Sequence, residues 1–292
     1  MTISGPRFPI LAPPLVPPGI CLVNCAYAPD AAERAAIGNR WGLGMEFRSL
    51  WGTGSAEARD VCAPEAKSEG ENPSDLVDVD PFAVVVDDSC STFGFTYGDY
   101  QARALQKHKA RESFIIAEQF WTGALSPSTF HLAYGGNVTD INGGTALAPP
   151  DAIDLMDQSL GQCLLGANGM IFCTPRVFLA TFLSAGLYRP NNGRMVFTHM
   201  DTPVVPDYGF PGTAPDGTSA DPTVEWMYGT AAAKVYRSQP VVFPTEAQFT
   251  SDPNRWQAVA RDRNTVTFRA ESIAAVVVDP ACLLGVKVSL PA

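Results

Sequence analysis

The sequence DYQARALQKHKARESFIIAEQFWTG, residues 99–123, decides the fold because it predicts one long helix with two different halves. Asp99 is placed to cap the start of this helix, and Gly123 is placed to end it in a left-handed conformation. The second half is apolar nearly all round, so we expect it to lie against a core. The first half carries a basic row, with a cation at every fourth position: Arg103, Lys107 and Arg111.

A strongly acidic stretch, residues 55–90, precedes this helix. It carries ten Asp or Glu, the last two being Asp87 and Asp88, against Arg59 and Lys67, in a chain of formal net charge −10. Because like charges repel and the stretch has no helical apolar stripe, it cannot bury itself and needs a partner surface. We hypothesise that this arm meets the basic row of a neighbouring subunit, the simpler alternative being that the row is a solvated face. The interface residues that the hypothesis predicts are Glu57, Asp60, Glu65, Lys67, Glu69, Glu71, Arg103, Lys107 and Arg111.

Composition restricts the class of protein. A chain of 292 residues with 46% hydrophobic and 17% charged residues can bury a substantial core, while 25 Gly and 25 Pro predict many turns and extended excursions. A net charge of −10 argues against binding nucleic acid by neutralising phosphates, which requires clustered Lys and Arg. The same charge is compatible with enclosing DNA, because a container wall works best if its contents do not adsorb to it.

Prolines interrupt the apolar N-terminal sequence, so we expect neither a signal peptide nor, in the absence of a long apolar run elsewhere, a membrane span. Residues 6–18 are predicted to form an extended strap that packs on another surface, and a disordered tail is the alternative. A short helix is expected to follow from Pro29 or Asp30 to Ile37.

The seven cysteines contain no CxxC pair and no zinc-finger spacing, so we predict reduced thiols in a cytosolic protein. A disulfide from Cys62 to a neighbouring subunit is the minority hypothesis. His108 and Glu112, four residues apart, are interpreted as an exposed ion pair rather than the start of a metal site. GxSxG, GxxxxGK[ST], HExxH and GxGxxG motifs are absent, which leaves a hydrolase using His131 or His199 as a weak alternative. We therefore expect no enzyme activity, no metal and no cofactor.

The remaining pattern predicts strands and helices of an α+β chain. Alternation over residues 41–47 and an apolar run at 82–86 predict two strands that flank the acidic tip. Further along, we expect a helix from Asp151 towards Gly166, a buried strand at 169–173 and a helix from 174 to 187. Three consecutive antiparallel strands are predicted to close the chain: 265–269, 273–278 and 282–288.

These segments, in this order, resemble the major capsid protein of tailed bacteriophages, with the Hong Kong ninety-seven-type fold that encapsulins share. The resemblance is carried by AEQFWTG at 117–123, MIFCTPR at 170–176, RNTVTFRAE at 263–271 and VVVDP at 276–280, and its specificity comes from their order. It implies five parts: an N-terminal arm (1–38), an E-loop (39–95), the spine helix with the first part of the P-domain (96–150), an A-domain (151–239) and the second part of the P-domain (240–292).

The resemblance also implies a function. The chain would self-assemble, as pentamers and hexamers, into an icosahedral shell that encloses packaged phage DNA without sequence-specific binding. Its other partners would be virion proteins such as a portal, scaffold or decoration protein, with no membrane. It would reside in the virion after assembly in the host bacterial cytoplasm. An encapsulin-type nanocompartment and a head-tail connector ring are the alternatives.

Two features of the resemblance concern maturation. Some members of this fold join an E-loop lysine covalently to a neighbour's asparagine. Lys67 with Asn254 or Asn264 could form such a crosslink here, although a solvated lysine that eases repulsion in the arm is the favoured interpretation. No segment precedes Met1 in the given sequence, which favours a separate scaffolding protein.

Overall fold

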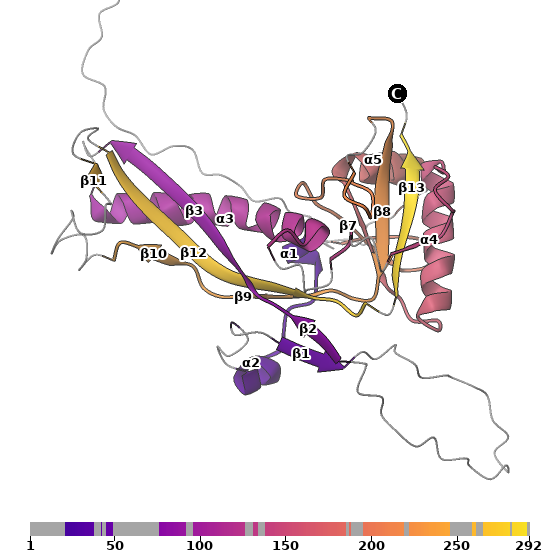
Figure 1. Cartoon of the computed structure of the whole chain (residues 1–292), viewed down its shortest axis with the longest axis horizontal. Coiled ribbons are helices and arrows are strands. Elements are labelled where there is room, and N and C mark those ends of the chain that lie inside the picture. Colours follow the sequence, from indigo (N-terminus) through magenta and orange to yellow (C-terminus); the bar gives the residue numbers. More distant parts are fainter. Residues whose placement is uncertain are drawn as a thin grey trace, which may run out of the picture.

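The computed structural model describes residues 21–37, 42, 45–48, 76–91, 96–125, 131–133, 138–184, 187, 195–218, 222–245, 259–260, 265–280 and 282–290. Its longest element is helix α3 (Tyr97–Thr122), which runs along an extended arm of the molecule towards a block of strands and helices (Figure 1). The predicted spine helix is thus confirmed. No helix in the described part of the chain combines the length and apolar composition that crossing a bilayer requires.

The two ends of α3 show why it forms where it does. Thr96, rather than Asp99, is the N-cap: its hydroxyl accepts from the Asp99 backbone N–H, and the Asp99 carboxylate accepts from the Thr96 N–H. At the other end Gly123 adopts φ 61°, the left-handed conformation expected of it. Local capping chemistry therefore sets both limits of the helix.

A five-stranded sheet lies along the first half of α3. Its centre is an antiparallel ribbon of β3 (Phe82–Ser91) and β12 (Thr265–Val277), and three shorter strands also pair with β12. Tyr100 and Ala104 of the helix pack against Phe268 and Ala270 of β12. The shorter strands are β9 (Lys234–Arg237), β10 (Val241–Phe243) and β11 (Val259–Ala260).

A six-stranded sheet forms the block at the far end of α3. The strand order is β4-β13-β8-β5-β7-β6. Side chains of β5 alternate between two cores: Phe172 joins Trp121 of α3, whereas Ile171 joins Met156 of α4. Helices therefore cover both faces of this sheet. The elements are β4 (Thr139–Asp140), α4 (Pro149–Cys163), β5 (Met170–Cys173), α5 (Pro175–Ser184), β6 (Val196–Phe197), β7 (Pro203–Pro206), β8 (Val224–Thr230) and β13 (Leu283–Ser289).

The closing strands differ from the prediction of three consecutive antiparallel strands. The first two are one continuous strand, β12, of 13 residues. Its alternation persists through the expected break, because Ala270 and Ser272 face inward while Glu271 faces outward. The last strand, β13, leaves this sheet and pairs with β8 in the other one. Ser272 is tolerated inside because its hydroxyl is hydrogen-bonded.

The strands beside the acidic tip also differ from the prediction. β1 (Met45–Arg48) pairs antiparallel with β2 (Leu76–Val79), so the return strand precedes β3 rather than being part of it. The four-residue strand β2 was hidden in the acidic stretch, where charge dominates the pattern. Residues 49–75, which hold the tip, lie outside the described residues, as does the predicted strap at 6–18.

The N-terminal part of the described chain contains two short helices. α1 (Leu22–Cys25) is too short to be predicted from periodicity, whereas α2 (Ala31–Ile37) confirms the short helix expected here. Further along, α4 begins at Pro149, two residues before the predicted cap Asp151, because proline is tolerated in a first helical turn.

Candidate functional site

The basic row of α3 meets a carboxylate of its own chain. Asp88 points inward from β3 with only 1% of its side chain exposed, and its Oδ2 lies 2.8 Å from Arg103 Nε. Lys107 Nζ pairs with the other carboxylate oxygen. A buried carboxylate without a partner would be very costly, and two cations satisfy this one. The acidic stretch and the basic row therefore do meet, but within one subunit and through Asp88.

Arg111, the third member of the row, has a different environment. It is exposed and makes no ion pair with any residue that the structure describes, and the same holds for Lys109. The predicted partners in the arm all lie outside the described residues: Glu57, Asp60, Glu65, Lys67, Glu69 and Glu71. Within the row, Arg111 is thus the cation most available to another subunit.

His108 and Glu112 are not the exposed ion pair that the sequence predicted. Both are buried between α3 and β12, where the Ser272 hydroxyl donates to Glu112 Oε1 at 3.1 Å and lies 3.1 Å from His108 Nε2. Arg237 Nη1 of β9 donates to Glu112 Oε2 at 3.3 Å. This network fastens the helix to two strands. Among the described residues, no cluster of His, Cys, Asp and Glu could hold a metal ion.

The other two histidines also have structural surroundings. His131 is buried, and its ring lies so close to Gly123 that a Cβ there would come within 2.1 Å of Nδ1. His199 is exposed in the turn between β6 and β7. His131 therefore has a packing role at the end of α3.

Asp207 is a buried carboxylate that sequence reasoning missed. Its oxygens accept from the backbone N–H of Leu22 at 2.8 Å and of Gly209 at 2.9 Å, and from the Ser113 hydroxyl at 3.4 Å. Burial raises the pKa of Asp207, and these hydrogen bonds oppose that rise. One side chain thus joins the start of α1, the middle of α3 and the loop after β7. Only long-range structure could reveal it, because the Leu22 contact spans 185 residues.

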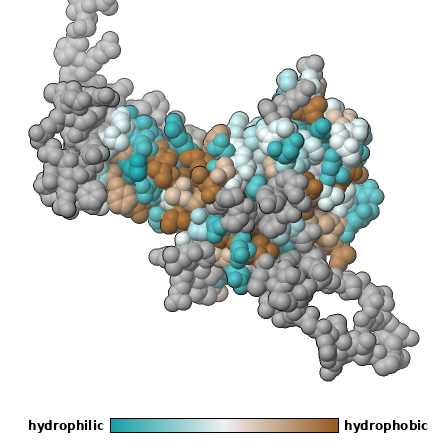
Figure 2. All heavy atoms as spheres, viewed as in Figure 1, coloured by the Kyte–Doolittle hydropathy of each residue, from teal (hydrophilic) through white to brown (hydrophobic). Residues whose placement is uncertain are grey.

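The outward face of the five-stranded sheet is partly apolar. Val85 of β3 and Ile273 of β12 are 39% and 40% exposed, and the pairing register places Val85 and Val241 on either side of Glu271. Apolar side chains gather on this arm of the molecule in the space-filling view (Figure 2). A sheet face packed on one side and partly apolar on the other suits contact with another protein surface. The strict alternation of β3 carried this signal in the sequence.

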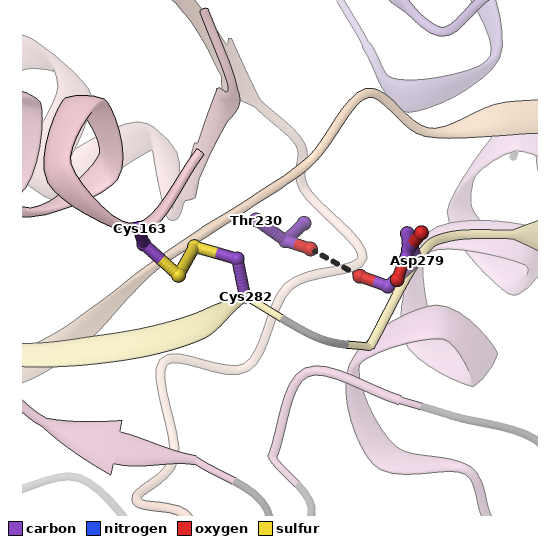
Figure 3. Close-up of a disulfide and its surroundings, with 4 residues drawn as sticks. All are labelled: Cys163, Thr230, Asp279 and Cys282. Carbon is purple, nitrogen blue, oxygen red and sulfur yellow. Dashed lines mark hydrogen bonds between the residues drawn. A yellow bond between two sulfur atoms is a disulfide. The ribbon is translucent and has the colours of Figure 1, made fainter. Parts of the chain in front are cut away.

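Two cysteines form a disulfide, which corrects the prediction of reduced thiols for this pair. Cys163 ends α4 and Cys282 precedes β13, with their Cα atoms 5.9 Å apart (Figure 3). A sequence separation of 119 residues concealed this proximity. Cys21, Cys25 and Cys173 are buried free thiols, and burial raises the pKa of Cys173. Cys62 lies outside the described residues.

No protein-family model and no curated protein matches the sequence. Solved structures do match. The capsid of a native GTA particle superposes with a TM-score of 0.56 at 12% identity, covering 98% of this chain and 96% of that one. A chain of Mycobacterium phage Che8 gives 0.52 at 12% identity, covering 98% and 97%. A chain of Gordonia phage Cozz gives 0.50 at 13% identity, covering 85% and 81%.

These matches extend over nearly the whole chain, so they concern the complete arrangement of α3 and the two sheets rather than one shared motif. At this level of identity they establish architecture. The chain therefore has the Hong Kong ninety-seven-type fold of phage capsid proteins.

Proposed function

We propose that many copies of this chain assemble into an icosahedral shell that encloses packaged DNA, as the major capsid protein of a tailed-phage-like particle. The observation that carries this proposal is the similarity to the capsid of a native GTA particle over 98% of the chain. Closed symmetry would multiply each contact between subunits, so single contacts can be weak.

The described surface supports a structural role. The partly apolar outward face of the five-stranded sheet offers an area for a neighbouring subunit, and the buried His108 network and Asp207 serve packing. We propose the domain roles on the same basis, with residues 39–95 as the E-loop and α3 as the spine. The six-stranded sheet, including β13, would form the A-domain, and the five-stranded sheet, including β9, would form the P-domain.

The proposed partners follow from the shell. Other copies would form pentamers and hexamers, and a portal, scaffold or decoration protein would join them. A chain with net charge −10 would enclose DNA without adsorbing it or reading its sequence. The protein would then reside in the virion, after assembly in the cytoplasm of a host bacterium, and would catalyse no reaction.

The proposed contact between the acidic arm and the basic row becomes narrower. Because Arg103 and Lys107 already neutralise Asp88, the arm of a neighbour would find its free cation at Arg111, beside Lys109. Reversing all three charges of the row would therefore damage the subunit itself, by surrounding a buried carboxylate with negative charge. Arg111 alone is the informative position.

Electron microscopy of the purified full-length protein tests the proposed function. We expect large closed shells when the chain is expressed alone or with a scaffolding protein, and DNA inside shells recovered from infected or induced cells. A small shell filled with protein would instead favour an encapsulin. An open ring would favour a head-tail connector, and monomers under all assembly conditions would contradict the proposal.

A further inference from the structure

The Cys163–Cys282 disulfide lies at the junction between the two sheets. Two connections between strands cross this junction in the described chain: one from β8 to β9, and one from β12 to β13. They run side by side, because Thr230 pairs with Leu283 at one end and Lys234 pairs with Val277 at the other. Any rotation of one sheet relative to the other must bend both connections.

The junction is already well packed without the disulfide. The Thr230 hydroxyl donates to the backbone oxygen of Asp279 at 3.3 Å, next to the disulfide (Figure 3). Ala231 and Ala233 of the first connection are buried. These contacts join the two connections to each other, but they do not join either one to a helix.

The disulfide supplies that missing link. Cys163 is the last residue of α4, whose Met156 and Leu160 pack against the six-stranded sheet. Cys282 is the residue through which the second connection enters β13. Their Cα separation of 5.9 Å lies within the range that a disulfide spans. Bonding them fixes the connection to the helix and so restricts bending at the junction.

We propose that this disulfide is a redox-controlled clamp that is open while the shell assembles and closes after the particle leaves the cell. The inference rests on the proposed function, because a shell made in a bacterial cytoplasm and then released meets first a reducing and then an oxidising environment. Assembly would thus occur with a bendable junction, and the released particle would hold the two sheets fixed.

The closing step is thiol–disulfide exchange with a small disulfide such as oxidised glutathione. The half-buried Cys163, as thiolate, attacks one sulfur of the small disulfide, forms a mixed disulfide and releases one thiol. The Cys282 thiolate then attacks Cys163 Sγ and displaces the second thiol. Two cysteine thiols are oxidised, one small disulfide is reduced to two thiols, and the protons of the cysteines end on those thiols.

The redox state of each cysteine is measured first. Cells containing assembled protein are quenched in acid and the cysteines are alkylated in denaturant; released particles are treated with oxidised glutathione and then handled in the same way. Peptide mapping should find both cysteines alkylated in cells and linked to each other after oxidation. A linked pair already present in the cells would overturn the proposed timing, and free thiols after oxidation would overturn the clamp.

Thermal melting measures the consequence. Oxidised particles should melt about 5 °C or more above reduced ones, because the bond closes a long loop. The difference should disappear in Cys163→Ala and in Cys282→Ala, and should persist in Cys173→Ala, which removes a buried thiol of the same sheet. Equal melting of oxidised and reduced wild type would overturn the clamp. Microscopy of every sample separates the two claims: absence of particles would count against the proposed function, while mapping and melting of the subunits would still decide the clamp.

Discussion

Two neighbouring aspartates show how burial decides the value of an ion pair. Asp87 Oδ1 lies 2.8 Å from Arg269 Nε, and Asp88 Oδ2 lies 2.8 Å from Arg103 Nε, so the two contacts have the same length. Asp87 faces outward with half of its side chain exposed, whereas Asp88 faces the helix with 1% exposed. Water can replace the partner of Asp87 but cannot reach Asp88.

The double substitution Arg103→Ala with Lys107→Ala should therefore lower the free energy of unfolding by about 3–5 kcal/mol, because it leaves a buried carboxylate unpaired. Arg269→Ala is the matched control, and at an exposed pair it should cost about 1 kcal/mol or less. Chemical denaturation of unassembled subunits measures both. Equal losses in the two variants would show that Asp88 gains solvent and that its burial does not matter.

At the scale of elements, α3 connects the two sheets through its two unlike halves. Its first half packs on the five-stranded sheet through Tyr100 and Ala104, and its second half packs on the six-stranded sheet through Phe120 and Trp121. Its C-terminal end is fixed by Gly123, which has φ 61° and lies against the His131 ring. The helix can thus stop abruptly and let the chain turn back.

Gly123→Ala should destabilise the protein by about 1–2 kcal/mol or more, because alanine disfavours the left-handed conformation and its Cβ would collide with His131. Gly161→Ala in α4 is the matched control. A Cβ at Gly161 meets nothing within 4 Å, so alanine should stabilise this helix by about 0.5–1 kcal/mol. Thermal or denaturant unfolding gives the two signs, and the same sign in both variants would contradict this account of α3.

The attachment of α2 depends on pH. Glu33 accepts from the Tyr236 hydroxyl and pairs with Lys234 Nζ at 2.9 Å, and these contacts, the tyrosine first, hold its pKa below the ordinary value of 4.5. A lowered folded-state pKa means that the contribution is complete above pH 4.5 and is lost as pH falls through the folded value. Amide hydrogen exchange in α2 should therefore accelerate, relative to its intrinsic rate, when the protein is acidified.

Glu33→Gln removes this dependence. In that variant α2 should exchange faster at neutral pH by an amount equivalent to about 0.2–1 kcal/mol and should respond little to acid. Tyr236→Phe, which keeps the ring in place and removes the hydroxyl donor, should lie between the wild type and Glu33→Gln. Identical pH profiles for α2 in the wild type and in Glu33→Gln would exclude Glu33 as the responsible group.

At the scale of the whole molecule, one surface cation becomes the test of the contact between subunits. Arg111→Glu should reduce the yield of assembled particles several-fold and leave subunit stability within about 0.5 kcal/mol, because Arg111 is exposed and pairs with no described residue. Lys109→Glu, an equal change of charge two residues away, is the control for net charge. Normal assembly of Arg111→Glu, or an equal defect in both variants, would contradict a specific contact at Arg111.

The sequence could predict what depends on neighbouring residues. The apolar half of α3 and the cap at Gly123 were visible because they rest on local periodicity and turn chemistry. Asp88 was missed even though Val84, Val86 and Asp88 share one face of β3, because its charge assigned it to the acidic arm. The Cys163–Cys282 pair could not be predicted, since 119 residues separate its members and only the packing of α4 brings them together.

The measurement that tests the central claim most directly is a cryo-electron microscopy reconstruction of particles assembled from the full chain. The account predicts a closed shell with icosahedral symmetry in which α3 and the outward face of the five-stranded sheet lie at subunit contacts and Asp88 stays paired with Arg103 within each subunit. An open ring, or a shell in which Asp88 pairs with a neighbour's cations, would contradict it.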